Sequence, residues 1–189
     1  MDLLLGGPLL VLAIFVGVVF MYFIGVYNKL AKLKVRIEEA WSQIDVQLKR
    51  RAALIPNLVE TVKGYASHEE GVFTQVTEAR SALMGASTAK EAGEADKQLG
   101  MALKSLFAVA EAYPELKAQE GFVNLQKELS DTEDKVSYSR QFYNSVVRDF
   151  NTMLVTFPTN LVAKMLNHTE KEFFEAEESE REDVKVDFS

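Results

Sequence analysis

The feature that most constrains this chain is an uncharged apolar run close to its first residue. Residues Leu3 to Tyr27, LLLGGPLLVLAIFVGVVFMYFIGVY, contain no Asp, Glu, Lys or Arg. As a helix with a rise of ~1.5 Å per residue, the run would extend roughly 37 Å, enough to cross a hydrocarbon layer about 30 Å thick. Leu, Ile, Phe and Val each favour insertion by roughly 0.3 to 0.6 kcal/mol near the centre of such a helix. The run therefore predicts a transmembrane anchor.

The flanks of this run predict that the anchor is retained and how it is oriented. Only Asp2 precedes the overlong apolar core, whereas a signal peptide has a basic n-region and a small-residue cleavage site. Lysines and an arginine follow the run and none precedes it, so the positive-inside rule predicts an outside N-terminus and a cytoplasmic domain. The predicted membrane-interface residues are Tyr22, Tyr27, Lys29, Lys32, Lys34 and Arg36.

Composition excludes several classes of function. The net charge of −7 leaves no basic stripe of the kind that binds nucleic acid by displacing counterions from phosphates. Because the chain has no cysteine, it can form no disulfide, thiolate metal site or cysteine nucleophile.

Apolar residues after the anchor recur at alternating steps of three and four, which is typical of helices that pack along a common seam, as in a coiled coil. Four stripes are present: Leu30 to Leu48, Leu58 to Leu83, Ala92 to Tyr113, and Phe122 to Phe157. The segment GASTAK predicts a turn in which Ser87 or Thr88 caps the following helix. Pro158 ends the fourth stripe, and a short helix capped by Thr159 is expected after it.

Pro56 leaves two architectures open. A chain reversal near Ala53 to Pro56 predicts an up-down-up-down four-helix bundle, in which the KRR run at residues 49–51 ends one helix and Pro56 lies in the first turn of the next. Without a reversal, a helix from Asn28 to Met84 would be about 85 Å long, and the bundle would have three long helices with the first kinked at Pro56. The end charges and matched lengths favour the reversal. Both alternatives are all-α, with an N-terminal transmembrane helix followed by an antiparallel helical bundle of long helices.

Several long motifs resemble one known family. The runs RIEEAWSQIDVQLKRRAALIPNLVETVKGYASHE, LQKELSDTED and FPTNLVAK, together with the ending FFEAEE…VKVDF, are similar to the LemA family of bacterial membrane proteins. The resemblance implies a single-pass protein of the bacterial cytoplasmic (inner) membrane with a helical-bundle domain and no established enzymatic activity. The family also includes proteins associated with magnetosome membranes. The signature or structural residues are Trp41, Asp45, Pro56, Asn57, Tyr65, Tyr143, Asn144, Asn151 and Pro158.

The predicted domains are an anchor at residues 1–27, a LemA-like antiparallel bundle at residues 28–167, and an acidic tail at residues 168–189. The last residues, VKVDFS, alternate apolar and polar side chains and could add to a neighbour as a strand or hook. The competing interpretation is a solvated terminus. The candidate tail contacts are Val184, Val186 and Phe188.

Residues with catalytic potential do not form a recognisable pattern. His68 and His168 do not have the H-E-x-x-H spacing, because Val72 stands where the second histidine would be. No phosphate-binding glycine loop, dinucleotide fingerprint or nucleophile elbow occurs. We therefore expect no catalytic residue, metal, cofactor or small-molecule substrate.

Two aromatic-asparagine pairs, Tyr143-Asn144 and Phe150-Asn151, repeat after seven residues. On a helix, the aromatic rings would fill successive layers while the asparagines flank them on one edge. The pairs are either ordinary core aromatics with amides at their edge or a register lock, within the bundle or between subunits.

Together these features predict a non-enzymatic, membrane-anchored helical scaffold that self-associates as a homo-oligomer and organises or remodels the membrane. Its expected partners are the lipid bilayer and further copies of itself. In the alternative, it is an adaptor that recruits a membrane protease or an envelope-stress partner through the bundle or the acidic tail. An enzyme with an unrecognised site is the third hypothesis.

Overall fold

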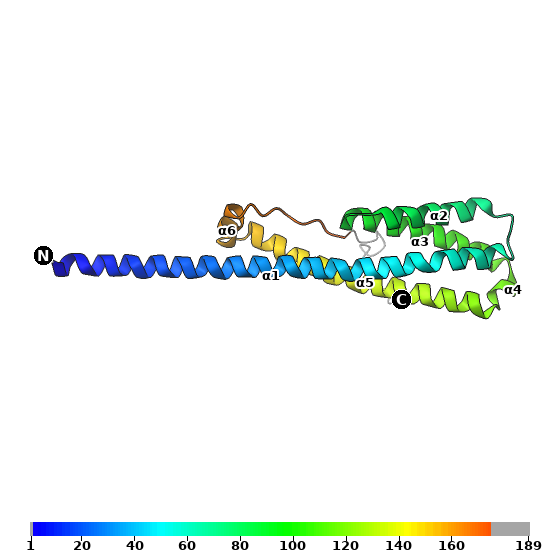
Figure 1. Cartoon of the computed structure of the whole chain (residues 1–189), viewed down its shortest axis with the longest axis horizontal. Coiled ribbons are helices and arrows are strands. Elements are labelled where there is room, and N and C mark those ends of the chain that lie inside the picture. The colour runs from blue at the N-terminus through cyan, green and yellow to red at the C-terminus, as the bar shows by residue number, and fades with distance from the viewer. Residues whose placement is uncertain (1, 175–189) are drawn as a thin grey trace, which may run out of the picture. The chain divides into compact units, whose positions relative to one another are not determined.

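The computed structural model describes the backbone of residues 2–174 and the side chains of residues 7–174. Within this range the chain forms helices and no strands (Figure 1). The helices are α1 (Asp2–Lys63), α2 (Glu70–Gly85), α3 (Ala89–Glu111), α4 (Pro114–Lys117), α5 (Glu120–Val155) and α6 (Thr159–Met165). The predicted all-α fold, with an apolar N-terminal helix and a helical bundle, is confirmed.

Helix α1 changes character along its length. From Leu9 to Met21 its large apolar side chains are exposed, and among the described residues α1 is the one helix long and apolar enough to cross a membrane. Val26 is the first buried apolar residue of α1, and buried positions then recur at steps of three and four. The helix therefore passes from an apolar surface on all sides to a one-sided apolar stripe without a break.

Contacts divide the chain into two compact units. The first contains α1 up to Glu39 and the segment Ser145–Lys171, which holds the end of α5 and all of α6. The ring of His168 meets that of Phe150 edge-on, with the ring centroids 5.7 Å apart. The predicted cap of α6 is wrong, because Pro158 occupies the N-cap position. The Thr159 hydroxyl instead contacts two carbonyl oxygens at the end of α5, those of Met153 and Thr156.

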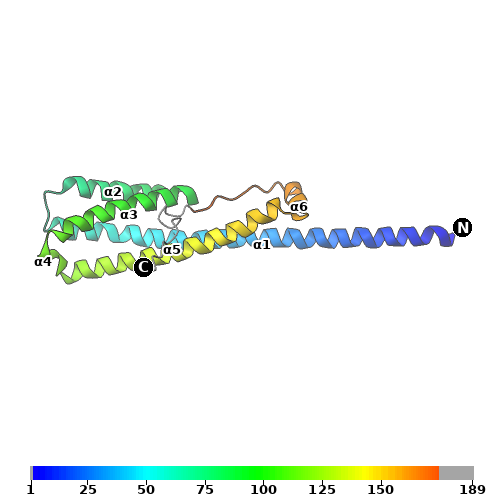
Figure 2. The ribbon, with the colours of Figure 1, turned by 180° about the vertical axis from the view of Figure 1, so that it is seen from behind.

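The second unit contains Ala40–Asn144 and residues 172–174 of the described chain. Four helices lie side by side in it: the second part of α1, α2, α3 and the first part of α5 (Figure 2). Thr88 caps α3 as predicted, since its hydroxyl accepts the Glu91 N–H at 3.2 Å while the Glu91 carboxylate accepts the Thr88 N–H. Hydrogen bonds from the Ser87 backbone, the Ser87 hydroxyl and the Thr88 backbone lower the pKa of Glu91.

The predicted chain reversal at Pro56 is wrong. Helix α1 continues through Pro56 to Lys63, and the chain turns at residues 64–69. Neither predicted architecture included a turn there. Proline lacks the N–H that would donate to the carbonyl four residues earlier, which belongs to the fully buried Ala52. Arg80 of α2 supplies the missing donor, with its Nε 2.8 Å from the Ala52 oxygen. The bundle still has four long helices, but the first reversal lies beyond the proline.

Replacing Arg80 tests this explanation. Arg80→Met should lower the free energy of unfolding by about 1–3 kcal/mol, because it leaves a buried carbonyl without its donor. In a Pro56→Ala background the same change should cost clearly less, since the introduced alanine can supply an N–H from within the helix. The measurement is a double-mutant cycle from denaturant unfolding of the detergent-solubilised full chain, followed by circular dichroism. An equal loss in both backgrounds would contradict the role assigned to Arg80.

Candidate functional site

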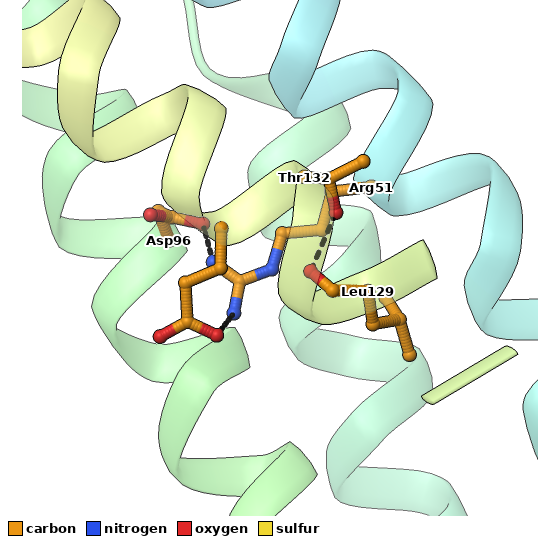
Figure 3. Close-up of polar contacts among 5 residues, drawn as sticks. Arg51, Asp96, Leu129 and Thr132 are labelled. Atoms are coloured by element: carbon orange, nitrogen blue, oxygen red, sulfur yellow. Dashed lines mark hydrogen bonds and ion pairs between the residues drawn. The ribbon is translucent and has the colours of Figure 1, made fainter. Parts of the chain in front are cut away.

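The most constrained polar group of the second unit is Arg51 of α1, which is only 4% exposed. Its Nη1 donates to Oδ1 of Asp96 on α3 at 2.7 Å, and its Nη2 donates to Oε2 of Glu133 on α5 at 3.3 Å. Figure 3 shows this group beside Thr132, a fully buried residue of α5 whose hydroxyl donates to the Leu129 carbonyl at 2.8 Å. One guanidinium thus connects three of the four helices.

Burial dominates the electrostatics of this group. The pKa of Asp96 is raised, chiefly because burial disfavours the carboxylate and only secondarily because Glu133 lies near. The charge and hydrogen bond of Arg51, and the charge of Arg140, act in the opposite direction but do not outweigh burial. The Nε of Arg51 is also buried and has no hydrogen-bond partner. The cluster therefore positions helices rather than adding much net stability.

A cavity of about 450 Å³ adjoins the cluster, and Arg51 forms part of its wall. Lys97 and Lys104 of α3 contribute two further cations to the lining, and Glu133 is the acidic residue among the lining side chains. The remaining lining residues are Gly100, Met101, Leu103, Phe107, Gln126, Leu129 and Ser130. The cavity combines apolar walls with a net positive lining, which suits an anionic group rather than a cation.

The second polar feature is a segment held against α5 by its backbone. Asn144 donates from Nδ2 to the carbonyl oxygen of Phe174 and accepts the Phe174 N–H at Oδ1, both at 2.9 Å. The Tyr143 hydroxyl donates to the Glu172 carbonyl at 3.0 Å. Burial, and secondarily the Glu172 charge, raises the pKa of Tyr143. Phe174 is 1% exposed, and its ring lies 6.0 Å from the guanidinium carbon of Arg140.

The same pair of bonds occurs in the first unit. Asn151 donates from Nδ2 to the carbonyl oxygen of Lys171 and accepts the Lys171 N–H at Oδ1, both at 2.9 Å. An asparagine side chain used in this way bonds to a peptide group as a neighbouring β-strand would, and it does not depend on the side chain of its partner. We call residues 171–174 the strap.

The other predicted structural residues lie outside these two features or at their edge. The Trp41 and Tyr143 ring centroids are 6.1 Å apart, and Asp45 forms an exposed ion pair with Lys49 at 2.7 Å. Asn57 follows Pro56 in α1, and its carbonyl accepts the Thr61 hydroxyl at 2.7 Å. Tyr65 is partly exposed in the turn after α1, and Pro158 follows a cis peptide bond.

The predicted membrane-interface residues all lie on the surface of α1 in the first unit: Tyr22, Tyr27, Lys29, Lys32, Lys34 and Arg36. Val184, Val186 and Phe188 lie outside the described residues. The roles predicted for the membrane-interface residues and for the tail residues stay predictions, as do the predicted domain boundaries. Within the described part of the chain, no three His, Cys, Asp or Glu residues form a group that could hold a metal ion.

Sequence reasoning missed Arg51 and Asp96. Arg51 was interpreted as one of three cations at a helix end, and nothing in the run KRR distinguishes it from its neighbours. Asp96 gave a usable signal, because it lies four residues after Ala92 and three before Leu99, which are both buried. A carboxylate on the apolar face of a helix requires a buried partner.

An apolar helix that continues into an antiparallel helical bundle defines a class of membrane-associated helical proteins. The sequence profile of the LemA family matches residues 40–188, and the chain belongs to this family.

Three relatives illustrate the range of similarity. Protein LemA of Metamycoplasma hominis is 30% identical over 170 residues, which cover 89% of this chain and 78% of the relative. Magnetosome protein MamQ 2 of Paramagnetospirillum magneticum is 23% identical over 175 residues, and magnetosome protein MamQ of Magnetospirillum gryphiswaldense is 22% identical over 174 residues. These matches cover 79% and 78% of this chain. The chain spans 64% of the length of each magnetosome relative.

The Arg51 cluster predicts a strong coupling between two substitutions. Asp96→Leu alone should lower the free energy of unfolding by about 3–5 kcal/mol, because it leaves a buried guanidinium without its closest partner. Glu133→Gln should cost under about 1 kcal/mol, since that side chain is 64% exposed. Adding Arg51→Met to Asp96→Leu should restore most of the loss. Denaturant unfolding of the full chain in detergent measures all three, and a double variant no more stable than Asp96→Leu would contradict this account.

Proposed function

We propose that this protein is a non-enzymatic, membrane-anchored scaffold that self-associates and organises or remodels the bacterial cytoplasmic membrane. The observation that carries the proposal is the continuity of α1. A single helix contains the exposed apolar run that can span the bilayer and the buried stripe of the bundle.

An exposed apolar surface in the first unit also supports the proposal. It lies at the junction of α5 and α6, where Phe157 is 75% and Met165 72% exposed, and Val155 and Leu161 are exposed as well. Exposed apolar side chains that lie close together in the chain are candidates for contact with protein or lipid. We assign this surface, defined by residues 155, 157, 161 and 165, to contact between copies of the protein.

The basic residues of α1 give the scaffold an orientation. Lys29, Lys32 and Lys34 follow the apolar run and would contribute about 1 kcal/mol each at an anionic leaflet. The bundle then lies in the cytoplasm and the N-terminus outside. The names of the relatives describe no catalytic activity, and those named magnetosome proteins are consistent with a role at a membrane.

The second candidate function is an adaptor, and the strap favours it. Asn144 holds a peptide backbone rather than a particular side chain, so the same surface could accept an extended segment of another protein. In this case the chain would recruit a membrane-protein partner, such as a protease or an envelope-stress component.

Native sizing of the detergent-extracted protein tests self-association. The natural chain should migrate as a species larger than a monomer, and Phe157→Asp with Met165→Asp should shift it toward the monomer. Tyr138→Asp is the matched control, because Tyr138 is equally exposed but lies on α5 in the second unit. A strictly monomeric natural chain would refute the scaffold. Co-purification of a different protein with that monomer would favour the adaptor, and imaging of reconstituted vesicles would show whether an oligomer deforms membranes.

The orientation has a separate test, made simple by the absence of cysteine from the chain. Thr74→Cys places one thiol on the exposed face of α2. We expect a membrane-impermeant maleimide to label it in permeabilised spheroplasts but not in intact ones. In a separate variant, the thiol of Asp2→Cys should be labelled in intact spheroplasts as well. Labelling of position 74 in intact spheroplasts would place the bundle outside.

A further inference from the structure

The cavity beside Arg51 lies between one face of α3 and one face of α5. Its lining residues on α3, from Lys97 to Phe107, have the spacing of a single helix face, and so do those on α5, from Gln126 to Glu133. Both stretches belong to the second unit. The volume of about 450 Å³ falls within the range of roughly 300–1,000 Å³ that is usual for small-molecule sites. The cavity is therefore large enough for a small ligand.

Two cations of the lining are left without a carboxylate. Arg51 is already paired with Asp96 and Glu133, and Glu133 is the acidic residue of the lining. Among the described residues, no ion pair joins Lys97 or Lys104 to an acidic side chain. The two lysines are seven residues apart, which corresponds to ~10.5 Å along α3. Their charges are available to an anion that enters the cavity between them.

Gly100 lies between these two lysines and also lines the cavity. Glycine in the middle of a helix is less favourable than alanine, because it loses more backbone entropy on folding. A Cβ built on Gly100 would meet no neighbouring atom within 4 Å, so packing inside the protein does not require glycine at this position. Glycine also permits the close approach of a ligand to the backbone. The missing side chain leaves room for an anion beside α3.

The cavity becomes apolar one turn beyond Lys104. Phe107 lines this part, and its ring meets that of Phe122 edge-on, with the centroids 6.2 Å apart. Leu103 of α3 and Leu129 of α5 are buried and line the cavity as well. Apolar walls with a few polar groups in fixed positions are typical of sites for small organic molecules. The lining therefore suits a ligand with a charged part and an apolar part.

We propose that this cavity binds a small organic anion, in which a phosphate or carboxylate is attached to an apolar group. The anionic group lies beside Gly100 and pairs with Lys97 and Lys104, while the apolar group contacts Phe107 and Leu129. The molecule is a bound ligand rather than a substrate. Single-chain lipids and soluble aromatic acids both have this chemistry. The inference does not depend on whether the protein self-associates.

Calorimetric titration of the full chain in a nonionic detergent tests the proposal, with the same titration into detergent alone as the blank. The probes are hexyl phosphate, phenyl phosphate, hexanol and inorganic phosphate. We expect one organic phosphate at least to saturate a single site per chain, with an affinity at least tenfold higher than that of hexanol or inorganic phosphate. Tighter binding of hexyl phosphate would indicate a lipid-derived ligand, and tighter binding of phenyl phosphate a soluble aromatic one.

Removing the two lysines tests the anionic part of the site. Lys97→Gln/Lys104→Gln should weaken binding of the organic phosphate at least tenfold. Lys90→Gln/Lys127→Gln is the matched control, because these lysines are also exposed on α3 and α5 but do not line the cavity. The control variant should bind with unchanged affinity.

Filling the cavity tests the role of Gly100. Gly100→Leu should weaken binding at least tenfold without lowering the midpoint of thermal unfolding, because the space is open and leucine is the better helix former. Gln98→Leu introduces the same side chain at an exposed position of α3 outside the cavity and should leave binding unchanged.

Three results would overturn the proposal. The first is the absence of saturable binding by either organic phosphate, which is expected if another part of the protein or a partner fills the cavity. The second is equal weakening in the two pairs of lysine variants, which would show a response to overall charge. The third is unchanged binding in Gly100→Leu.

Discussion

The architecture depends on one hydrogen bond that replaces another. Pro56 removes the helical donor for the Ala52 carbonyl, and Arg80 of α2 supplies a donor from outside the helix at 2.8 Å. With this replacement donor in place, α1 remains a single helix from Asp2 to Lys63. Because the carbonyl is buried, the bond also specifies which part of α2 faces α1. Pro56 therefore helps to determine how α1 and α2 pair, although it does not end α1.

The Arg51 cluster and Asn144 also join segments that are far apart in the chain. Arg51 connects α1 to α3 and α5, and burial raises the pKa of Asp96 against the opposing effect of the Arg51 charge. Such a cluster contributes more to a unique helix arrangement than to total stability. Asn144 fixes the strap by its backbone. Apolar stripes alone would tolerate sliding of one helix along another, whereas these directional bonds do not.

Function follows from what the helices leave exposed. The apolar part of α1 and the α5–α6 surface present apolar side chains, while the cavity beside Arg51 presents positive charge. Exposed apolar surfaces suit contact with lipid or protein, and the positive lining of the cavity suits an anionic group. In the proposed scaffold, the two apolar surfaces make the contacts with the membrane and with further copies.

The sequence by itself determined the apolar N-terminal helix, the helical class, the turn at residues 86–88 and the Thr88 cap, because each depends on residues close together in the chain. It predicted the wrong reversal at Pro56, since the rule that proline interrupts a helix assumes that the freed carbonyl stays unpaired. Only the tertiary structure showed that Arg80 is the donor for the Ala52 carbonyl, since the two residues are 28 positions apart in the chain. The same reason applies to Arg51 with Asp96, separated by 45 residues, and to Asn144 with Phe174, separated by 30. A local pattern can show that Asp96 faces the core, but it does not identify a partner at such a distance, because the packing of whole helices decides which residues meet.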